Sequence, residues 1–275
     1  MSRITTTFDA LARERRTGLV TYVTAGDPDL DRSRRILRVL DRSGADVIEV
    51  GVPFSDPLAD GPVIQRSSER ALASGTTLAA ALDLVASVLA DIRAPLVLFT
   101  YANPAYRMGL ETFAKRAASA GVDGVLTLDV PVEESDDLRA ALTGAGLDVI
   151  FLLSPTTTAE RMERAGTLGS GFLYAISRLG VTGARATLAA GVADLVGRIR
   201  RATALPIAVG FGVSHPDHVR DVGQWADAAV VGSALVQTIA DAADAPDLDD
   251  RVARYVAWLR GGGAPAGVAD GAARR

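Results

Sequence analysis

The sequence contains no cysteine and only one lysine, Lys115, among its 29 basic residues. Without cysteine, the protein has no disulfide, no thiolate nucleophile and no cysteine-ligated metal site. Because Lys115 lies among polar positions of a predicted helix, Schiff-base aldol chemistry and pyridoxal phosphate attachment are not expected. Only two histidines occur, His215 and His218, at the predicted start of another helix. We interpret them as capping or surface residues, and we expect neither a metal nor a cofactor.

Excess charge and long apolar runs are also missing. The net charge of -4 gives no electrostatic footprint for nucleic acid. The N-terminal stretch MSRITTTFDALARERR lacks the apolar core of a signal peptide. No apolar run approaches the roughly 18–20 residues of a membrane span. We therefore expect a soluble cytoplasmic protein, and a hydrophobic content of 48% suits a well-buried core.

What the sequence does contain is a regular alternation of strand and helix patterns. The predicted strands are 19–24, 46–52, 95–101, 124–130, 148–154, 171–177, 206–212 and 228–234. The longer predicted helices are 7–16, 31–43, 62–73, 78–91, 110–121, 159–166, 188–201 and 249–260. Residues 102–109 are predicted as a loop.

This alternation predicts a single (β/α)8 TIM barrel with an extra N-terminal helix. The alternative is an open doubly wound sheet, which is weakened because no G-x-G-x-x-G follows the first strand. Since no linker interrupts the chain, we expect one catalytic domain over residues 1–260. The Gly/Ala-rich residues 261–275 are predicted to form a disordered tail.

One predicted strand carries a charge that needs an explanation. Glu49 interrupts the β-branched run of segment 46–52, and a carboxylate in a strand buried on both faces must gain a partner, a proton or a function. The rigid loop that follows carries Asp60. We hypothesise that Glu49 and Asp60 face one pocket. Taken alone, the strand leaves open a satisfied structural Glu49 and a solvated Asp60.

The active sites of barrels lie at the carboxyl ends of the strands, and this rule collects the informative residues on one rim. They are Glu49, Asp60, Tyr101, Asn103, Asp129, Tyr174, Thr182, Gly183, Gly210, Phe211, Gly212, Gly232 and Ser233. The glycines after strands seven and eight lie where barrels commonly bind phosphate. We expect Ser233 to cap the helix that begins there and to donate to phosphate. Tight-turn glycines with an ordinary cap are the alternative for either motif alone.

Several motifs together resemble one known family. VIEVGVPFSDPLADGPVIQ, LFTYANP, LDVPVEES, SRLGVTGAR, GFGVS and VGSA resemble the tryptophan synthase alpha chain over roughly residues 19–240. The resemblance implies a lyase of L-tryptophan biosynthesis that splits indole-3-glycerol phosphate into indole and glyceraldehyde 3-phosphate by retro-aldol cleavage. It also implies an α2β2 heterotetramer with a pyridoxal-phosphate beta subunit, which would meet the Pro53–Asp60 loop and residues 102–109.

The resemblance assigns roles to individual residues. The catalytic glutamate and aspartate match Glu49 and Asp60, and the conserved tyrosine of strand six matches Tyr174. Thr182, on the loop Arg178–Arg185, lies where the family contacts its loop aspartate. The phosphate-binding positions match Gly183, Gly210, Gly212, Gly232 and Ser233. Tyr22 lies at the aromatic site, where relatives often carry phenylalanine, and this departure is expected to affect packing around the indole rather than the chemistry.

The chemistry of the reaction agrees with this assignment. Cleavage needs protonation of indole C3 and deprotonation of a hydroxyl on the departing carbon, which one carboxyl group of raised pKa can perform in turn. This describes Glu49, while Asp60 can stabilise positive charge at the indole nitrogen.

Two other readings of the sequence remain open. One is a related barrel such as the synthase that makes indole-glycerol phosphate, which uses a lysine acid that no predicted strand here carries. The other is a phosphate-binding subunit that activates a partner without doing chemistry. Retention of both Glu49 and Asp60 argues against that second reading.

Overall fold

A computed structural model describes residues 1–176, 185–210 and 212–263, with residues 185–190 described by their backbone alone. Nine strands form one parallel sheet in the order β5-β4-β3-β2-β1-β9-β8-β7-β6. Their bounds are β1 (Gly18–Thr24), β2 (Val47–Gly51), β3 (Leu96–Thr100), β4 (Gly124–Thr127), β5 (Asp148–Ile150), β6 (Leu152–Leu153), β7 (Leu173–Ile176), β8 (Ile207–Gly210) and β9 (Ala228–Val231).

The two end strands of this sheet are pieces of one barrel strand. Only Phe151 separates β5 from β6, so the strand predicted over 148–154 is interrupted once. β5 pairs with β4 and β6 pairs with β7, and the backbone N–H of Tyr174 donates to the carbonyl oxygen of Phe151 over 2.9 Å. The sheet therefore closes on itself at this strand, and the predicted eight-fold barrel is confirmed.

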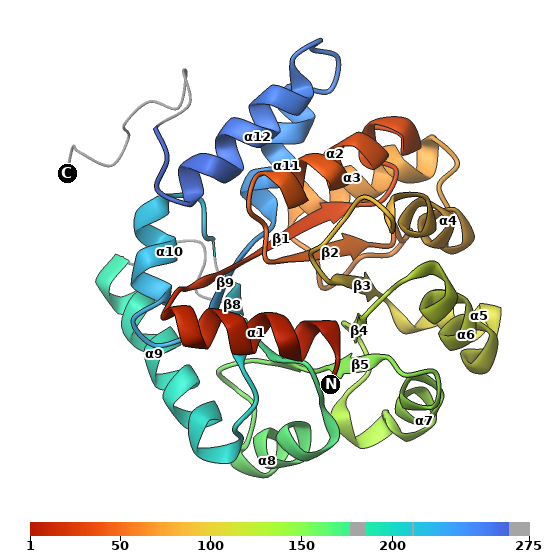
Figure 1. Ribbon diagram of the computed structural model, residues 1–275. Coiled ribbons are helices and arrows are strands. Elements are labelled where there is room, and N and C mark those ends of the chain that lie inside the picture. The colour runs from red at the N-terminus through yellow and green to blue at the C-terminus, as the bar shows by residue number, and fades with distance from the viewer. Residues whose placement is uncertain (177–184, 211, 264–275) are drawn as a thin grey trace.

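Helices surround the barrel, as Figure 1 shows. They are α1 (Arg3–Glu14), α2 (Leu30–Arg42), α3 (Pro62–Ala73), α4 (Leu78–Val88), α5 (Ala102–Met108), α6 (Leu110–Ala120), η1 (Val132–Glu134), α7 (Asp136–Gly144), α8 (Ala159–Leu168), α9 (Arg185–Ala202), α10 (Pro216–Val222), α11 (Ser233–Asp241) and α12 (Leu248–Leu259). Among the described residues no single helix is long and apolar enough to span a membrane; α3 and α4 pass that test only as a pair, bent by 92°.

The prediction of a loop over 102–109 is wrong, because this segment contains helix α5. Pro104 is compatible with the helix since it lies in the first turn, where the missing N–H has no helical partner to lose. The carboxylate of Asp129, at the end of the neighbouring strand, accepts the N–H of Ala102 over 2.7 Å. That contact between residues distant in sequence caps the helix and was not visible in the local pattern.

The N-terminal helix closes one end of the barrel. Inward-facing residues of the strands form one apolar cluster, and Ile4, Phe8 and Leu11 of α1 belong to it. In Figure 1, α1 crosses the barrel opening at the amino ends of the strands. A separate and larger cluster fills the space between the outer face of the sheet and the surrounding helices. Because its amino end is plugged, the interior can receive a ligand only from the carboxyl end.

The same aspartate hydrogen bond recurs between neighbouring strands at the amino end of the barrel. Asp46, Asp123 and Asp227 each stand immediately before a strand. Their side chains accept the backbone N–H of Leu19, Leu96 and Ile207 at the start of the preceding barrel strand, over 2.7, 2.8 and 2.7 Å respectively. Each of these hydrogen bonds satisfies a backbone N–H that has no partner on the adjacent strand, so the three aspartates help to fix the register of the strands that they join.

We expect Asp46→Ala to lower the free energy of unfolding by about 2–4 kcal/mol. Besides the N–H of Leu19, Asp46 binds the guanidinium groups of Arg16 and Arg260, and its side chain is only 11% exposed. Urea unfolding should show the loss. The matched substitution Asp31→Ala, at an 84% exposed carboxylate whose ion pair within the described part of the chain is with Arg34, should cost less than about 1 kcal/mol. Equal effects of the two substitutions would contradict the proposed role of Asp46.

Candidate active site

Strand β2 places Glu49 inside the barrel. Glu49 lies two residues after the inward-facing Val47 and is level with Tyr22 of β1 and Val97 of β3. It is fully buried, and neither carboxylate oxygen has a hydrogen-bond partner among the described residues. Burial raises the pKa of Glu49 to about 8. The group is therefore protonated at neutral pH and available as an acid.

The loop after β2 holds a second acid, Asp60, against a tyrosine. The hydroxyl of Tyr101 donates to Oδ2 of Asp60 over 3.0 Å and accepts the N–H of Ala59 over 3.0 Å. The Tyr101 ring stacks on Phe54 with centroids 4.8 Å apart. Burial raises the pKa of Asp60 to about 6, against the opposing effect of the Tyr101 hydrogen bond. Asp60 is therefore ionised at neutral pH while Glu49 is not.

Two buried tyrosines share this environment. Burial raises the pKa of Tyr22 and of Tyr174, and the charges of both Glu49 and Asp60 raise each of them further. Both phenols therefore stay neutral across the physiological range. The edge of the Tyr22 ring meets Phe99, with centroids 5.1 Å apart. The structure thus brings together Glu49, Asp60, Tyr22 and Tyr174.

Two strand-end glycines make room for these tyrosine rings. A Cβ at Gly51 would overlap the hydroxyl of Tyr22, and a Cβ at Gly210 would overlap the hydroxyl of Tyr174. The sequence assigned Gly210 to phosphate and gave no role to Gly51. Both positions require glycine for a steric reason that arises from side chains on other strands.

The mouth of the barrel has an apolar wall that the sequence analysis missed. Five partly buried side chains pack against the interior cluster. They are Val63, Ile64, Leu128, Leu152 and Ile176. Leu128, Leu152 and Ile176 each follow an inward-facing residue by two positions, so the period of two could have identified them. A partly exposed apolar wall beside neutral phenols suits a flat aromatic ligand.

The predicted phosphate positions are only partly described. Gly212 has a positive φ of 51°, and no atom would lie within 4 Å of an added Cβ. Ser233 was expected to cap α11, and this is wrong: Gly232 is the N-cap, with no side-chain cap bond, and Ser233 is the first helical residue. The helix therefore begins with backbone N–H groups rather than a hydroxyl cap. Thr182, Gly183 and Phe211 lie outside the described residues.

The remaining candidates have structural explanations. His215 is the N-cap of α10, where its Nδ1 accepts the N–H of Asp217 over 3.2 Å, and Lys115 pairs with Glu111 on an exposed helix face. No group of three potential metal ligands occurs in the described part of the chain.

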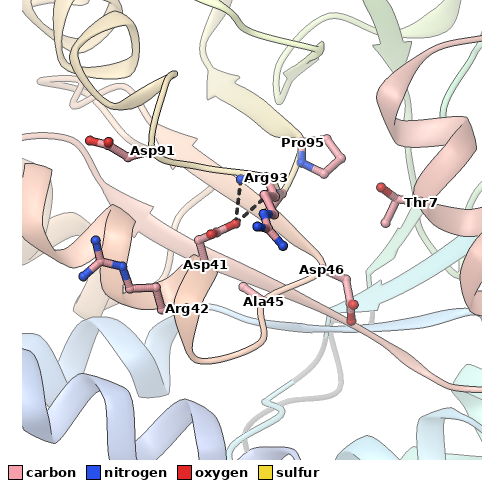
Figure 2. A pocket seen from close by; sticks show the side chains of 9 residues that line it. Thr7, Asp41, Arg42, Ala45, Asp46, Asp91, Arg93 and Pro95 are labelled. Atoms are coloured by element: carbon pink, nitrogen blue, oxygen red, sulfur yellow. Dashed lines mark hydrogen bonds between the residues drawn. The ribbon is translucent and has the colours of Figure 1, made fainter.

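A surface hollow of about 580 Å³ lies at the opposite, amino end of the barrel (Figure 2). There the carboxylate of Asp41 already accepts the backbone amides of Arg93 and Ala94, over 2.9 and 2.8 Å. Because Asp41 is engaged in holding the chain and the acid pair lies at the other end, this hollow is not the candidate site.

A buried acid and an ionised acid at the carboxyl end of a closed barrel define an acid–base enzyme of the TIM-barrel class. The sequence profile of the tryptophan synthase alpha chain matches residues 8–257. The alpha chain of Solibacter usitatus is 48% identical over 262 residues, covering 95% of this chain and 98% of the relative. That of Geotalea uraniireducens is 50% identical over 262 residues, with the same coverage of 95% and 98%.

Solved structures agree with the sequence comparison. The alpha subunit from Legionella pneumophila is 36% identical and superimposes with a TM-score of 0.88, covering 95% of this chain and 98% of that one. The aminoacrylate-bound tryptophan synthase of Mycobacterium tuberculosis gives 34% identity and a TM-score of 0.85, with coverage of 94% and 98%. The chain belongs to the tryptophan synthase alpha chain family. It is a carbon–carbon lyase of L-tryptophan biosynthesis that cleaves indole-3-glycerol phosphate and has a beta-subunit partner.

Proposed function

We propose that Glu49 and Asp60 divide the cleavage of indole-3-glycerol phosphate between them. The observation that carries the proposal is the opposite protonation of the buried Glu49 and the partly buried Asp60, with pKa values of about 8 and about 6. Glu49 donates its proton to C3 of the indole ring. As a carboxylate it then takes the proton of the hydroxyl on the departing carbon, so that a carbonyl forms and the carbon–carbon bond breaks toward the protonated ring. Asp60 stabilises the positive charge at the indole nitrogen by accepting its proton, and returns that proton to the nitrogen as the carbon–carbon bond breaks, so that neutral indole leaves.

The rest of the mouth orients the substrate. Tyr22, Tyr174 and the apolar wall enclose the indole ring, and Tyr101 holds Asp60 in place. The backbone N–H groups at the start of α11, together with Gly210, Gly212, Gly232 and Ser233, receive the phosphate. The assignments of Thr182 and Gly183 to the closing loop and phosphate, and of Phe211 to the substrate, rest on the family resemblance.

The proposal predicts a bell-shaped pH dependence of kcat/KM. Asp60 must be ionised, so activity should rise as the pH passes about 6. Glu49 must be protonated, so activity should fall as the pH passes about 8. Steady-state indole release measured between pH 5 and 9 checks both limbs. A profile that kept rising up to pH 9 would contradict the assignment of Glu49 as the acid.

We further propose an α2β2 heterotetramer in the cytoplasm. The exposed side chains of Leu58 (92%) and Tyr106 (51%) lie on the Pro53–Asp60 loop and on α5, at the face assigned to the beta subunit. Burial of such apolar groups would contribute to association. A catalytic domain ending near residue 260 also remains a prediction. It is supported by Arg260, whose guanidinium donates to the carbonyls of Gly44 and Thr17 over 2.8 and 3.2 Å.

The decisive experiment assays the purified chain for indole release, alone and with a beta subunit. We expect slow cleavage by the chain alone and faster cleavage in the complex, because the partner contacts the loop that carries Asp60. Fast cleavage by the isolated chain would indicate a free-standing lyase. No indole in either assay would indicate a subunit that binds without catalysis, and would overturn the proposal. Light scattering of the mixture measures the stoichiometry.

A further inference from the structure

A short chain of buried hydroxyl groups runs from the active site to helix α3. Thr24 and Ser67 are both almost fully buried, and their hydroxyl oxygens lie 2.6 Å apart. The Ser67 hydroxyl donates to the carbonyl oxygen of Ile64 over 2.8 Å. At the other end, the Tyr22 hydroxyl lies 3.4 Å from Thr24 Oγ1, which makes this the weakest of the three links.

The donor and the acceptor of each hydrogen bond in this series follow from its final acceptor, the carbonyl oxygen of Ile64. A carbonyl oxygen can only accept, so the single proton of Ser67 is committed to Ile64. Ser67 therefore accepts from Thr24, and Thr24 accepts from Tyr22. The Tyr22 proton is thus directed away from the carboxyl groups of the site, and the phenol is held in one orientation.

The chain ends on the helical turn that follows Asp60. Ile64 is the third residue of α3, which begins at Pro62. The next residue, Gln65, donates its side-chain amide to the carbonyl oxygens of Pro57 and Asp60, over 3.3 and 3.0 Å. The Thr24–Ser67 contact thus joins this part of α3 to β1, and the Gln65 amide joins it to the loop that carries Asp60. Buried hydroxyl groups are costly unless paired, so burial of Thr24 and Ser67 favours the geometry in which their hydroxyls meet. Their presence therefore points to placement of the turn rather than to stability alone.

We propose that the hydroxyl chain Tyr22–Thr24–Ser67 positions Asp60 for the reaction by fixing the first turn of α3. The inference rests on the proposed role of Asp60. Tyr22, Thr24 and Ser67 are positioning residues here, since the hydrogen bonds that define this role are made to protein groups. Thr24 and Ser67 were not among the candidates found in the sequence, because neither belongs to a catalytic motif.

The test compares Thr24→Val, which removes the hydroxyl at nearly constant shape, with Thr24→Ser, which keeps it. Loss of one buried hydrogen bond should lower kcat by about 3- to 10-fold in Thr24→Val. We expect KM within twofold of the original chain, and recovery of kcat in Thr24→Ser. Tyr22→Phe should lower kcat less than Thr24→Val does, because the 3.4 Å link from Tyr22 to Thr24 is the weakest of the three. Ser87→Ala, which removes a hydroxyl that donates to the carbonyl of Leu84 within the outer helix α4, should leave kcat unchanged.

A double-mutant cycle shows whether the effect passes through Asp60. In an Asp60→Asn background, Thr24→Val should cause no further loss of kcat. A further loss by the same factor, or unchanged turnover in the single variant, would overturn the inference while leaving the role of Asp60 intact. Near-normal activity of Asp60→Asn alone would overturn the proposed function, and the inference with it. If Thr24→Val does not fold, Ser67→Ala interrupts the same chain without added volume and gives the same comparison.

Discussion

Replacing Glu49 by glutamine is expected to abolish most of the activity and yet to make the protein more stable at alkaline pH. The activity loss should be on the order of 10⁴-fold, since an amide can neither give nor take the proton at C3 and at the hydroxyl. The fold should survive because glutamine has nearly the same shape. Indole release measures the first effect, and urea unfolding at two pH values measures the second.

The sign of the stability effect follows from the raised pKa. Burial raises the pKa of Glu49 from 4.5 to about 8, so between these values the folded protein holds a proton that the unfolded chain has lost. The native state then binds more protons, and stability falls as the pH rises through this window. Glutamine does not titrate, so the stability difference in favour of Glu49→Gln should grow by about 3 kcal/mol from pH 5 to pH 8.

A matched substitution separates this effect from a general loss of charge. Glu134 is an exposed glutamate of η1, so Glu134→Gln should leave both the activity and the pH dependence of unfolding nearly unchanged. If Glu49→Gln showed the same pH dependence of stability as the original chain, Glu49 would not be the buried neutral acid described above. If it kept near-normal cleavage with the fold intact, another group would be the acid.

Asp60→Asn should lower kcat by about 10²- to 10³-fold with little change in stability. An asparagine oxygen can still accept the hydroxyl of Tyr101, so the loop is expected to keep its position while the negative charge is lost. That charge is what stabilises the indole nitrogen in the proposed transition state. Because the interaction forms chiefly in the transition state, the loss should appear in kcat rather than in KM.

Asp56→Asn serves as the matched control for this prediction. Asp56 lies on the same loop and is exposed, and its carboxylate accepts a hydrogen bond only from the Ser55 hydroxyl among the described residues. In the isolated chain it should retain normal turnover, and steady-state kinetics of both variants with circular dichroism spectra check the comparison. Equal losses in the two variants would indicate a disturbed loop rather than a missing charge, and would remove Asp60 from the mechanism.

Much of the site was predictable because the signals are local. The alternation of apolar strand and helix patterns determined the barrel, and with it the end at which Glu49 and Asp60 lie. A glutamate within a buried β-branched run must be neutral or paired, and among the described residues it has no hydrogen-bond partner, with its pKa raised to about 8. N-terminal helix α1 and the capping role of His215 also follow from neighbouring residues alone.

Other features depend on contacts between residues remote in sequence, which no local pattern encodes. The hydroxyl of Tyr101 reaches Asp60 across 41 positions, and that of Thr24 reaches Ser67 across 43. For the same reason, α5 formed where a loop was expected, because Asp129 of another segment caps it. Helix α11 has Gly232 rather than Ser233 as its N-cap.

The sequence by itself therefore determined the barrel and the end of it at which Glu49 and Asp60 lie. Only the tertiary structure decided how Asp60 is held and why Gly51 and Gly210 must be glycine. Backbone periodicity is a property of consecutive residues, whereas the distance between two side chains on different strands is set only when the barrel closes.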